Sequence, residues 1–162
     1  MKDGQNDLRP AATVPGLADI GLANYPPYLM NRIMGRYNAS IRDEMAKLGL
    51  TTPKMRALAV LSVMDGLLIS QLAVHAIVEQ STLSRALDAL QAEGLIRRET
   101  DADDSRATRV SITVAGRAAF ETLWPNMAET YRAMFRGIED AERRAFVATL
   151  QKIHTNIRKH DF

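Results

Sequence analysis

Residues 79–116 constrain the fold of this chain more than any other segment. Apolar residues recur at helical spacing in its first part, at Leu83, Leu87 and Leu90. This part ends at Gly94, and two short alternating stretches follow, separated by a charged turn. In the second stretch Val110 and Ile112 alternate with polar residues, as a half-buried strand requires. The order predicts a helix, a β-hairpin and the start of another helix.

The polar side chains of this segment lie at the N-terminal end of the predicted helix and in the turn of the predicted hairpin. A helix with polar residues at its N-terminal end fits the major groove, and an arginine on a loop tip fits the narrow, negative minor groove. The predicted DNA-contacting residues are Gln80, Ser81, Ser84 and Arg85 on the helix, and Arg106 and Arg109 on the hairpin. Asp104 is expected to pair with Arg106 or Arg109 and to hold the shape of the hairpin. For Arg85, a surface pair with Asp88 is the alternative.

Proline, glycine and capping residues divide the chain into four segments. We expect a flexible arm over 1–23, a helix over 24–49, a helix–helix–helix–hairpin unit over 50–113 and two C-terminal helices over 114–162. Thr52 and Asp140 are predicted N-caps, and residues 67–69 allow a further short strand. The last helix carries an apolar stripe that one such unit leaves uncovered, formed by Phe146, Leu150, Ile153 and Ile157.

Composition excludes several classes of protein. The chain has no cysteine, which excludes disulfides and thiolate zinc sites, and His75, His154 and His160 lack ligand spacing. We found no motif of a hydrolase, kinase or dinucleotide-binding enzyme, so neither an enzyme nor a cofactor is expected. The polar N-terminus and the absence of a long apolar run predict no signal peptide, no membrane span and a cytoplasmic location.

Three stretches resemble the MarR family, the multiple-antibiotic-resistance type of transcription regulator. They are residues 81–90 (STLSRALDAL), residues 93–98 (EGLIRR), and Asp104-Ser105-Arg106 followed by Val110, Thr113 and Gly116. The resemblance implies a mainly α winged helix-turn-helix with a two-stranded β-hairpin wing, flanked by N- and C-terminal dimerisation helices. It also implies a homodimer, a palindromic operator and, in many members, a small, often phenolic effector.

Two positions depart from the family pattern. Many relatives have threonine or serine where this chain has Leu68, and glycine where it has Ile77. At Ile77 we therefore expect a turn without positive φ and a local change before the next helix, the recognition helix, which we predict over residues 80–93. The missing cysteines exclude the thiol-oxidation mechanism of one branch of the family.

The sequence thus predicts a DNA-binding transcription regulator, expected to be a repressor that binds double-stranded DNA as a homodimer and responds to a small aromatic effector whose binding residues are unknown. The first alternative is a winged-helix protein–protein interaction module without DNA binding. It predicts no salt-dependent affinity for any duplex. The second is a helical catalytic or ligand-binding protein, for which the sequence offers no residues.

Overall fold

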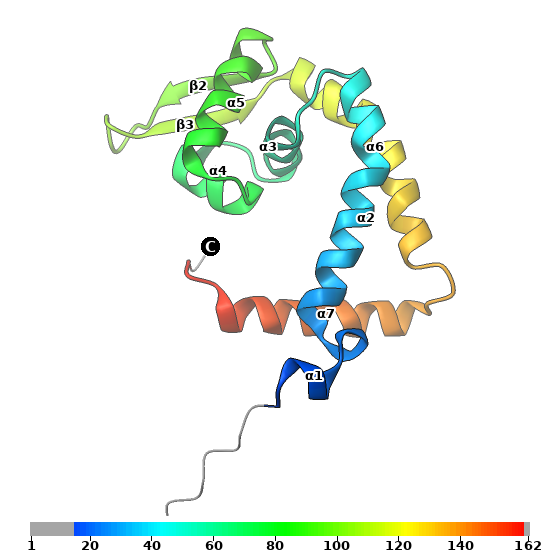
Figure 1. The fold of residues 1–162 in the computed structure, drawn as a ribbon. Coiled ribbons are helices and arrows are strands. Elements are labelled where there is room, and N and C mark those ends of the chain that lie inside the picture. Colours follow the sequence, from blue (N-terminus) through cyan, green and yellow to red (C-terminus); the bar gives the residue numbers. More distant parts are fainter. Residues whose placement is uncertain (1–14, 161–162) are drawn as a thin grey trace, which may run out of the picture. The chain divides into compact units, whose positions relative to one another are not determined.

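The computed structural model describes residues 15–160, and its elements are labelled in Figure 1. The helices are α1 (Leu17–Ile20), the short 3₁₀ helix η1 (Leu22–Asn24), α2 (Pro26–Lys47), α3 (Thr52–Val63), α4 (Ile69–Ala76), α5 (Gln80–Ala92), α6 (Val114–Met134) and α7 (Asp140–Ile157). The strands are β1 (Leu67–Leu68), β2 (Ile96–Thr100) and β3 (Thr108–Ile112). This mainly helical order with a small sheet confirms the predicted fold class.

The N-terminal segment differs from the expected arm. Leu17–Ile20 form α1 and Leu22–Asn24 form η1, two short helices without buried residues that the sequence did not predict within the expected arm over 1–23. Its remainder, residues 1–14, lies outside the described residues. The chain divides within α2 into two compact units, residues 1–39 and 40–162.

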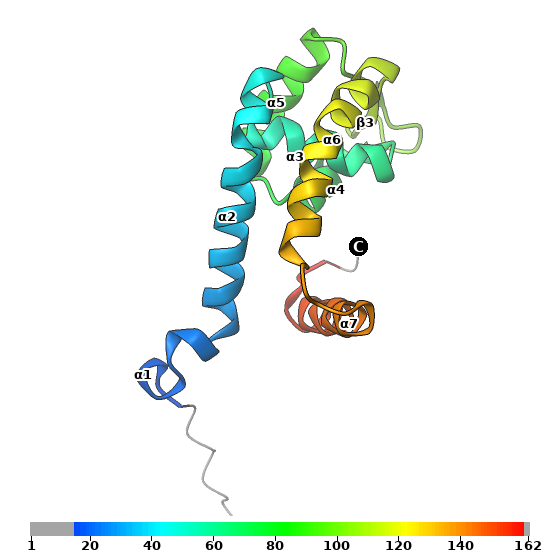
Figure 2. The same ribbon diagram turned by 90° about the vertical axis from the view of Figure 1, so that its right-hand side faces the viewer.

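The core of the second unit forms around α3. This helix packs against α4, α5 and α6, which surround it in both views (Figure 1, Figure 2). The largest fully buried side chains are aliphatic: Ile41, Leu58, Leu61, Leu72, Leu83, Leu87, Leu90, Val110 and Leu123. Leu83, Leu87 and Leu90 are the stripe that the helical spacing predicted. Their burial sets the rotation of α5 and turns its opposite face to solvent.

The sheet has three antiparallel strands in the order β1-β3-β2. Ile96 pairs with Ile112, and Leu67 pairs with Val110, so the predicted hairpin gains one short strand at the place the sequence allowed. Ile96, Val110 and Ile112 are buried. The alternating pattern therefore identified the inward face of β3.

Two predicted helix caps are wrong by one residue. The N-caps are Thr51 and Glu139, each with extended backbone, whereas Thr52 and Asp140 are the first residues of α3 and α7. Pro53 still lies in the first turn of α3, where its missing N–H costs nothing. The Asp140 carboxylate instead accepts a hydrogen bond from Arg143 at 3.1 Å.

Helix α7 keeps its apolar stripe in solvent. None of the described residues of α7 is buried, and Ile157 is 73% exposed. Phe146 contacts Phe135, the residue after α6, with ring centroids 6.4 Å apart. One chain therefore leaves this stripe largely uncovered, as the sequence predicted. Every helix within residues 15–160 is too short or too polar to cross a bilayer.

Candidate nucleic-acid interface

Helix α5 begins with a carboxylate cap that sequence reasoning missed. Glu79 is the N-cap residue, and its carboxylate accepts hydrogen bonds from the Ser81 hydroxyl and from the Thr82 backbone N–H at 3.3 Å. The Ser81 hydroxyl, followed by the backbone N–H groups of Ser81 and Thr82, holds the pKa of Glu79 below its ordinary value. Glutamate is not a preferred N-cap residue, so only its place before the helical stretch signalled this role.

The outer face of α5 is polar and open to solvent. Gln80, Ser81 and Arg85 are exposed, and Ser84 is half-buried. Within residues 15–160 Arg85 makes no ion pair, and Asp88 pairs with Arg98 instead. The alternative pair between Arg85 and Asp88 therefore does not form, and the guanidinium group of Arg85 is available to a ligand.

Arg98 connects the hairpin to α5. It lies on β2, and its guanidinium group donates to Oδ1 of Asp88 at 2.8 Å and to the Ser84 carbonyl oxygen at 3.3 Å. The Arg98 side chain is 22% exposed, whereas that of its neighbour Arg97 is 56% exposed and pairs with Glu99. Arg98 thus holds α5 against the sheet, and its charge is turned away from solvent.

The base of the hairpin is organised by Asp101, a second residue that sequence reasoning missed. This buried carboxylate accepts hydrogen bonds from the backbone N–H groups of Asp104 at 2.9 Å and Asp103 at 3.0 Å, and from Nε of Arg109. Arg109 also donates to the carbonyl oxygen of Gly66 at 2.8 Å. Arg109 is therefore engaged within the protein.

The tip of the hairpin presents Arg106. Its side chain is 95% exposed, and its backbone N–H donates to the Asp104 carboxylate at 2.9 Å. The Asp104 carbonyl oxygen accepts a hydrogen bond from the N–H of Ala107 at 2.9 Å. Asp104 therefore closes the turn, while the Arg106 guanidinium, whose Nε lies 3.9 Å from the Asp104 carboxylate, extends into solvent.

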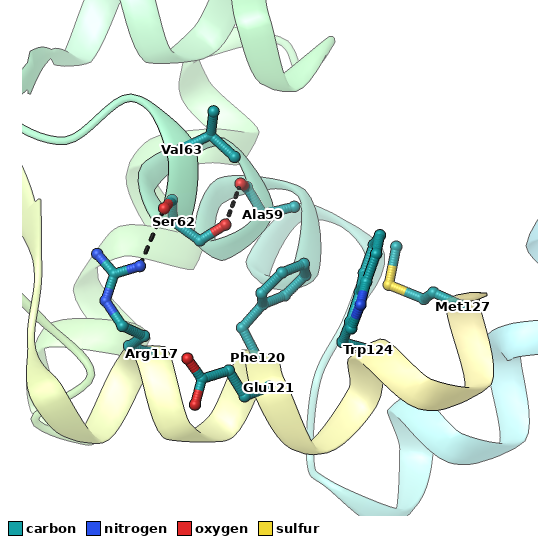
Figure 3. A pocket seen from close by; sticks show the side chains of 8 residues that line it. All are labelled: Ala59, Ser62, Val63, Arg117, Phe120, Glu121, Trp124 and Met127. Atoms are coloured by element: carbon teal, nitrogen blue, oxygen red, sulfur yellow. Dashed lines mark hydrogen bonds between the residues drawn. The ribbon is translucent and has the colours of Figure 1, made fainter.

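A pocket of about 420 Å³ lies between α3 and α6 (Figure 3). It is lined by Ala59, Ser62 and Val63 of α3 and by Arg117, Phe120, Glu121, Trp124 and Met127 of α6. The rings of Phe120 and Trp124 lie 6.3 Å apart, and Arg117 donates to the Ser62 carbonyl oxygen at 2.9 Å. Its wall is thus mostly apolar, with one cation and one anion, as is typical of small-molecule sites.

Comparisons with known proteins identify the family. The family model described as "MarR family" matches residues 48–107. The crystal structure of a MarR-family transcriptional regulator from Silicibacter pomeroyi is 59% identical, has a TM-score of 0.88, and covers 91% of this chain and 100% of that one. The chain belongs to the MarR family.

Two further relatives extend the comparison. The HTH-type transcriptional repressor IacR of Pseudomonas putida is 26% identical over 134 residues, which are 83% of this chain and 80% of that protein. The structure of BpsR from Bordetella bronchiseptica, whose DNA binding is regulated by 6-hydroxynicotinic acid, is 25% identical with a TM-score of 0.67. It covers 79% of this chain and 97% of that one. The resemblance proposed from sequence is confirmed, and this MarR-family chain is a transcriptional regulator.

The expected departure of this MarR-family chain at Ile77 is wrong. Ile77 has φ 54° and ψ 49°, the left-handed conformation that glycine adopts readily. At Leu68 the N-cap has no side-chain acceptor, and Gln71 instead accepts a hydrogen bond from the Leu68 N–H at 3.1 Å. The start of α4 and the turn before α5 are therefore both kept, although Leu68 and Ile77 differ from the residue types that many relatives have at these positions.

Asp101→Asn is expected to loosen the wing of this MarR-family protein and to lower its stability at neutral pH. Hydrogen bonds from the Asp104 N–H first, then from the Asp103 N–H and Arg109, hold the pKa of Asp101 below its ordinary 3.8. The ionised carboxylate therefore makes its full contribution to the free energy of unfolding above that ordinary value. This contribution is lost as pH falls through the lower pKa of the folded state. Urea unfolding at about pH 7 and about pH 3 should show the difference between wild type and variant shrink at the lower pH.

Asp103→Asn is the matched control for this measurement. It removes a neighbouring charge from the wing while leaving the Asp101 carboxylate and its three donors in place. An Asp101→Asn variant as stable as the Asp103→Asn variant at neutral pH would contradict the organising role of Asp101.

Proposed function

We propose that this chain is a repressor that binds a palindromic operator as a homodimer, with α5 in successive major grooves and the wing in the flanking minor grooves. The observation that carries the proposal is that Arg85 on α5 and Arg106 on the wing tip both present their guanidinium groups to solvent. The buried leucines of α5 and the Asp101 turn hold the two elements that carry these arginines. An arginine on a recognition helix suits the O6 and N7 atoms of guanine, and one on a wing suits a narrow minor groove.

The remaining predicted contacts have different roles in this proposal. Gln80, Ser81 and Ser84 line the same edge of α5 and would contact base edges or phosphates. Because the Ser81 hydroxyl donates to Glu79, its oxygen is left to accept a hydrogen bond from DNA. Arg109, which is held by Asp101 and Gly66, would support the wing more than touch DNA.

The homodimer in this proposal is supported by the apolar stripe of α7. Phe146, Ile153 and Ile157 are 45%, 36% and 73% exposed in one chain. A contiguous apolar stripe on a soluble protein marks an interface. We assign this stripe to a second copy, because a palindromic operator needs two recognition helices related by a two-fold axis.

Arg85→Ala is expected to weaken binding to a selected operator duplex by about 1–3 kcal/mol, which is roughly 5- to 150-fold. Binding to a random duplex should change much less, because the lost contact is to a base edge. Fluorescence anisotropy at several salt concentrations measures both affinities. Equal losses on the two duplexes would make Arg85 a phosphate contact.

Arg132→Ala is the matched control, since Arg132 is an exposed arginine of α6 whose ion-pair partner, Glu129, is on the same helix. It should change operator affinity only slightly. The alternative function, a protein–protein interaction module, predicts no salt-dependent affinity for any duplex, even for the wild type. Such a result would overturn the proposal as a whole.

The pocket between α3 and α6 supports an effector site for a small hydroxylated aromatic acid. Phe120 and Trp124 offer aromatic surface, Arg117 suits a carboxylate, and Glu121 accepts a hydrogen bond from a hydroxyl group. A ligand that prefers one spacing of the recognition helices would release DNA by population shift. Trp124 is the only tryptophan, so its fluorescence follows a titration with 6-hydroxynicotinic acid, and unchanged emission would contradict this part of the proposal.

A further inference from the structure

Ile77 combines backbone strain with exposure. It is the C-cap of α4, with φ 54° and ψ 49°, and is the only residue other than glycine with positive φ within residues 15–160. A β-branched side chain is sterically disfavoured in this region. The side chain is also 79% exposed, so packing within the chain does not offset the strain.

The turn itself does not need an isoleucine. The Ile77 N–H donates to the Val74 carbonyl oxygen at 3.2 Å, the Val78 N–H donates to that of Ala73 at 3.1 Å, and Arg56 donates to the Ile77 carbonyl oxygen at 3.0 Å. Ile77 takes part in these hydrogen bonds only through its backbone atoms. A glycine at this position would supply the same atoms with less strain. The isoleucine side chain therefore destabilises the turn of the free protein, and its packing within the chain is too small to offset the strain.

Ile77 lies close to the start of α5, and this position indicates which ligand its side chain would contact. It lies two residues before the N-cap Glu79 and three before Gln80, so its Cα lies within about 11 Å of the first residue of α5. The next residue, Val78, is half-buried, and the three that follow it, Glu79, Gln80 and Ser81, are exposed and polar. Apolar side chains beside the polar residues of a recognition helix can contact the methyl group of thymine on the major-groove edge of DNA.

We propose that Ile77 contacts the 5-methyl group of a thymine in the major groove and thereby contributes to operator specificity. This inference rests on the proposed function, since it needs α5 to enter that groove. The thymine methyl is the apolar feature of the major-groove edge, and aliphatic side chains recognise it by direct contact. The left-handed turn would thus hold an exposed aliphatic group beside the polar residues of α5, at the expense of stability in the free protein.

The test uses the full chain and a duplex selected by the wild type from a randomised library. Ile77→Gly should raise Tm by about 1–4 °C, because the strain is relieved. The same variant should bind the selected duplex roughly three- to tenfold more weakly, as expected for one lost aliphatic contact. Replacing the contacted thymine by deoxyuridine removes only its methyl group, so this duplex should cost the wild type a similar factor and the variant nothing further.

Two further variants separate the side chain from the backbone. Ile77→Asn tolerates the left-handed conformation without an aliphatic group, and it should lose affinity like Ile77→Gly. Ile77→Val keeps a branched aliphatic group and should retain most of the affinity. If the affinity losses caused by Ile77→Gly and by deoxyuridine add up when both changes are combined, the inference is overturned. Full affinity of the Ile77→Asn variant would overturn it too. Neither result would affect the proposed function. A wild type that selects no duplex would overturn both.

Discussion

Gly116→Ala is expected to destabilise the protein by about 3 kcal/mol and to lower Tm by roughly 6–12 °C. A Cβ atom at this position would lie 2.0 Å from the Leu95 carbonyl oxygen and 3.0 Å from Cγ1 of Ile112. That carbonyl oxygen cannot move freely, because it accepts a hydrogen bond from the Thr113 N–H at 3.1 Å. Relief of the clash therefore requires α6 to move away from the sheet. Thermal and urea unfolding measure the loss.

Ala115→Ser is the control for this prediction. Ala115 is exposed in the same first turn of α6, so the substitution should change the free energy of unfolding by less than about 0.5 kcal/mol. Operator affinity of the Gly116→Ala variant should also fall, because α6 follows directly from β3 of the wing. If Gly116→Ala proved as stable as Ala115→Ser, the close approach between α6 and Leu95 would be wrong.

Removal of α7, by ending the chain at Glu139, is expected to convert the proposed homodimer into a monomer or an insoluble chain. Operator affinity should fall by at least about 100-fold, since each half-site would then bind independently. The physical reason is that the apolar stripe of α7 is exposed in one chain and would be buried against a second copy. Sedimentation velocity and an electrophoretic mobility assay measure the two effects.

Ile157→Lys tests the same interface in a chain that keeps its fold. Ile157 is 73% exposed in one chain, so a lysine there is tolerated by the monomer and disfavoured inside an apolar interface. We expect weaker dimerisation with unchanged helical content by circular dichroism. Lys152→Ala, a substitution at an exposed polar position of the same helix, serves as the control. A well-folded monomer of the intact wild type at micromolar concentration would contradict the dimer.

The local sequence pattern predicted the structure of residues 79–116 well. The expected helix over 80–93 is α5, Gln80–Ala92, and its buried leucines are those that the spacing indicated. The two wing strands also lie where apolar and polar residues alternate. Such features depend on the repeat of one helix or strand, which neighbouring residues determine. Helix caps were less accurate, since Thr51 and Thr52 are identical by residue type, and α7 has Glu139 as its N-cap although the following aspartate is the preferred type.

The sequence by itself determined the family, the order of elements and the outward face of α5, because periodicity and short motifs express them within a few residues. Only the tertiary structure decided which charges are free. Asp88 and Arg98 are ten residues apart, Arg109 and Gly66 are 43 apart, and Arg85 is exposed while Asp88 pairs with Arg98. The left-handed Ile77 was likewise decided by backbone hydrogen bonds of the folded turn, which overrode the conformational preference of its side chain.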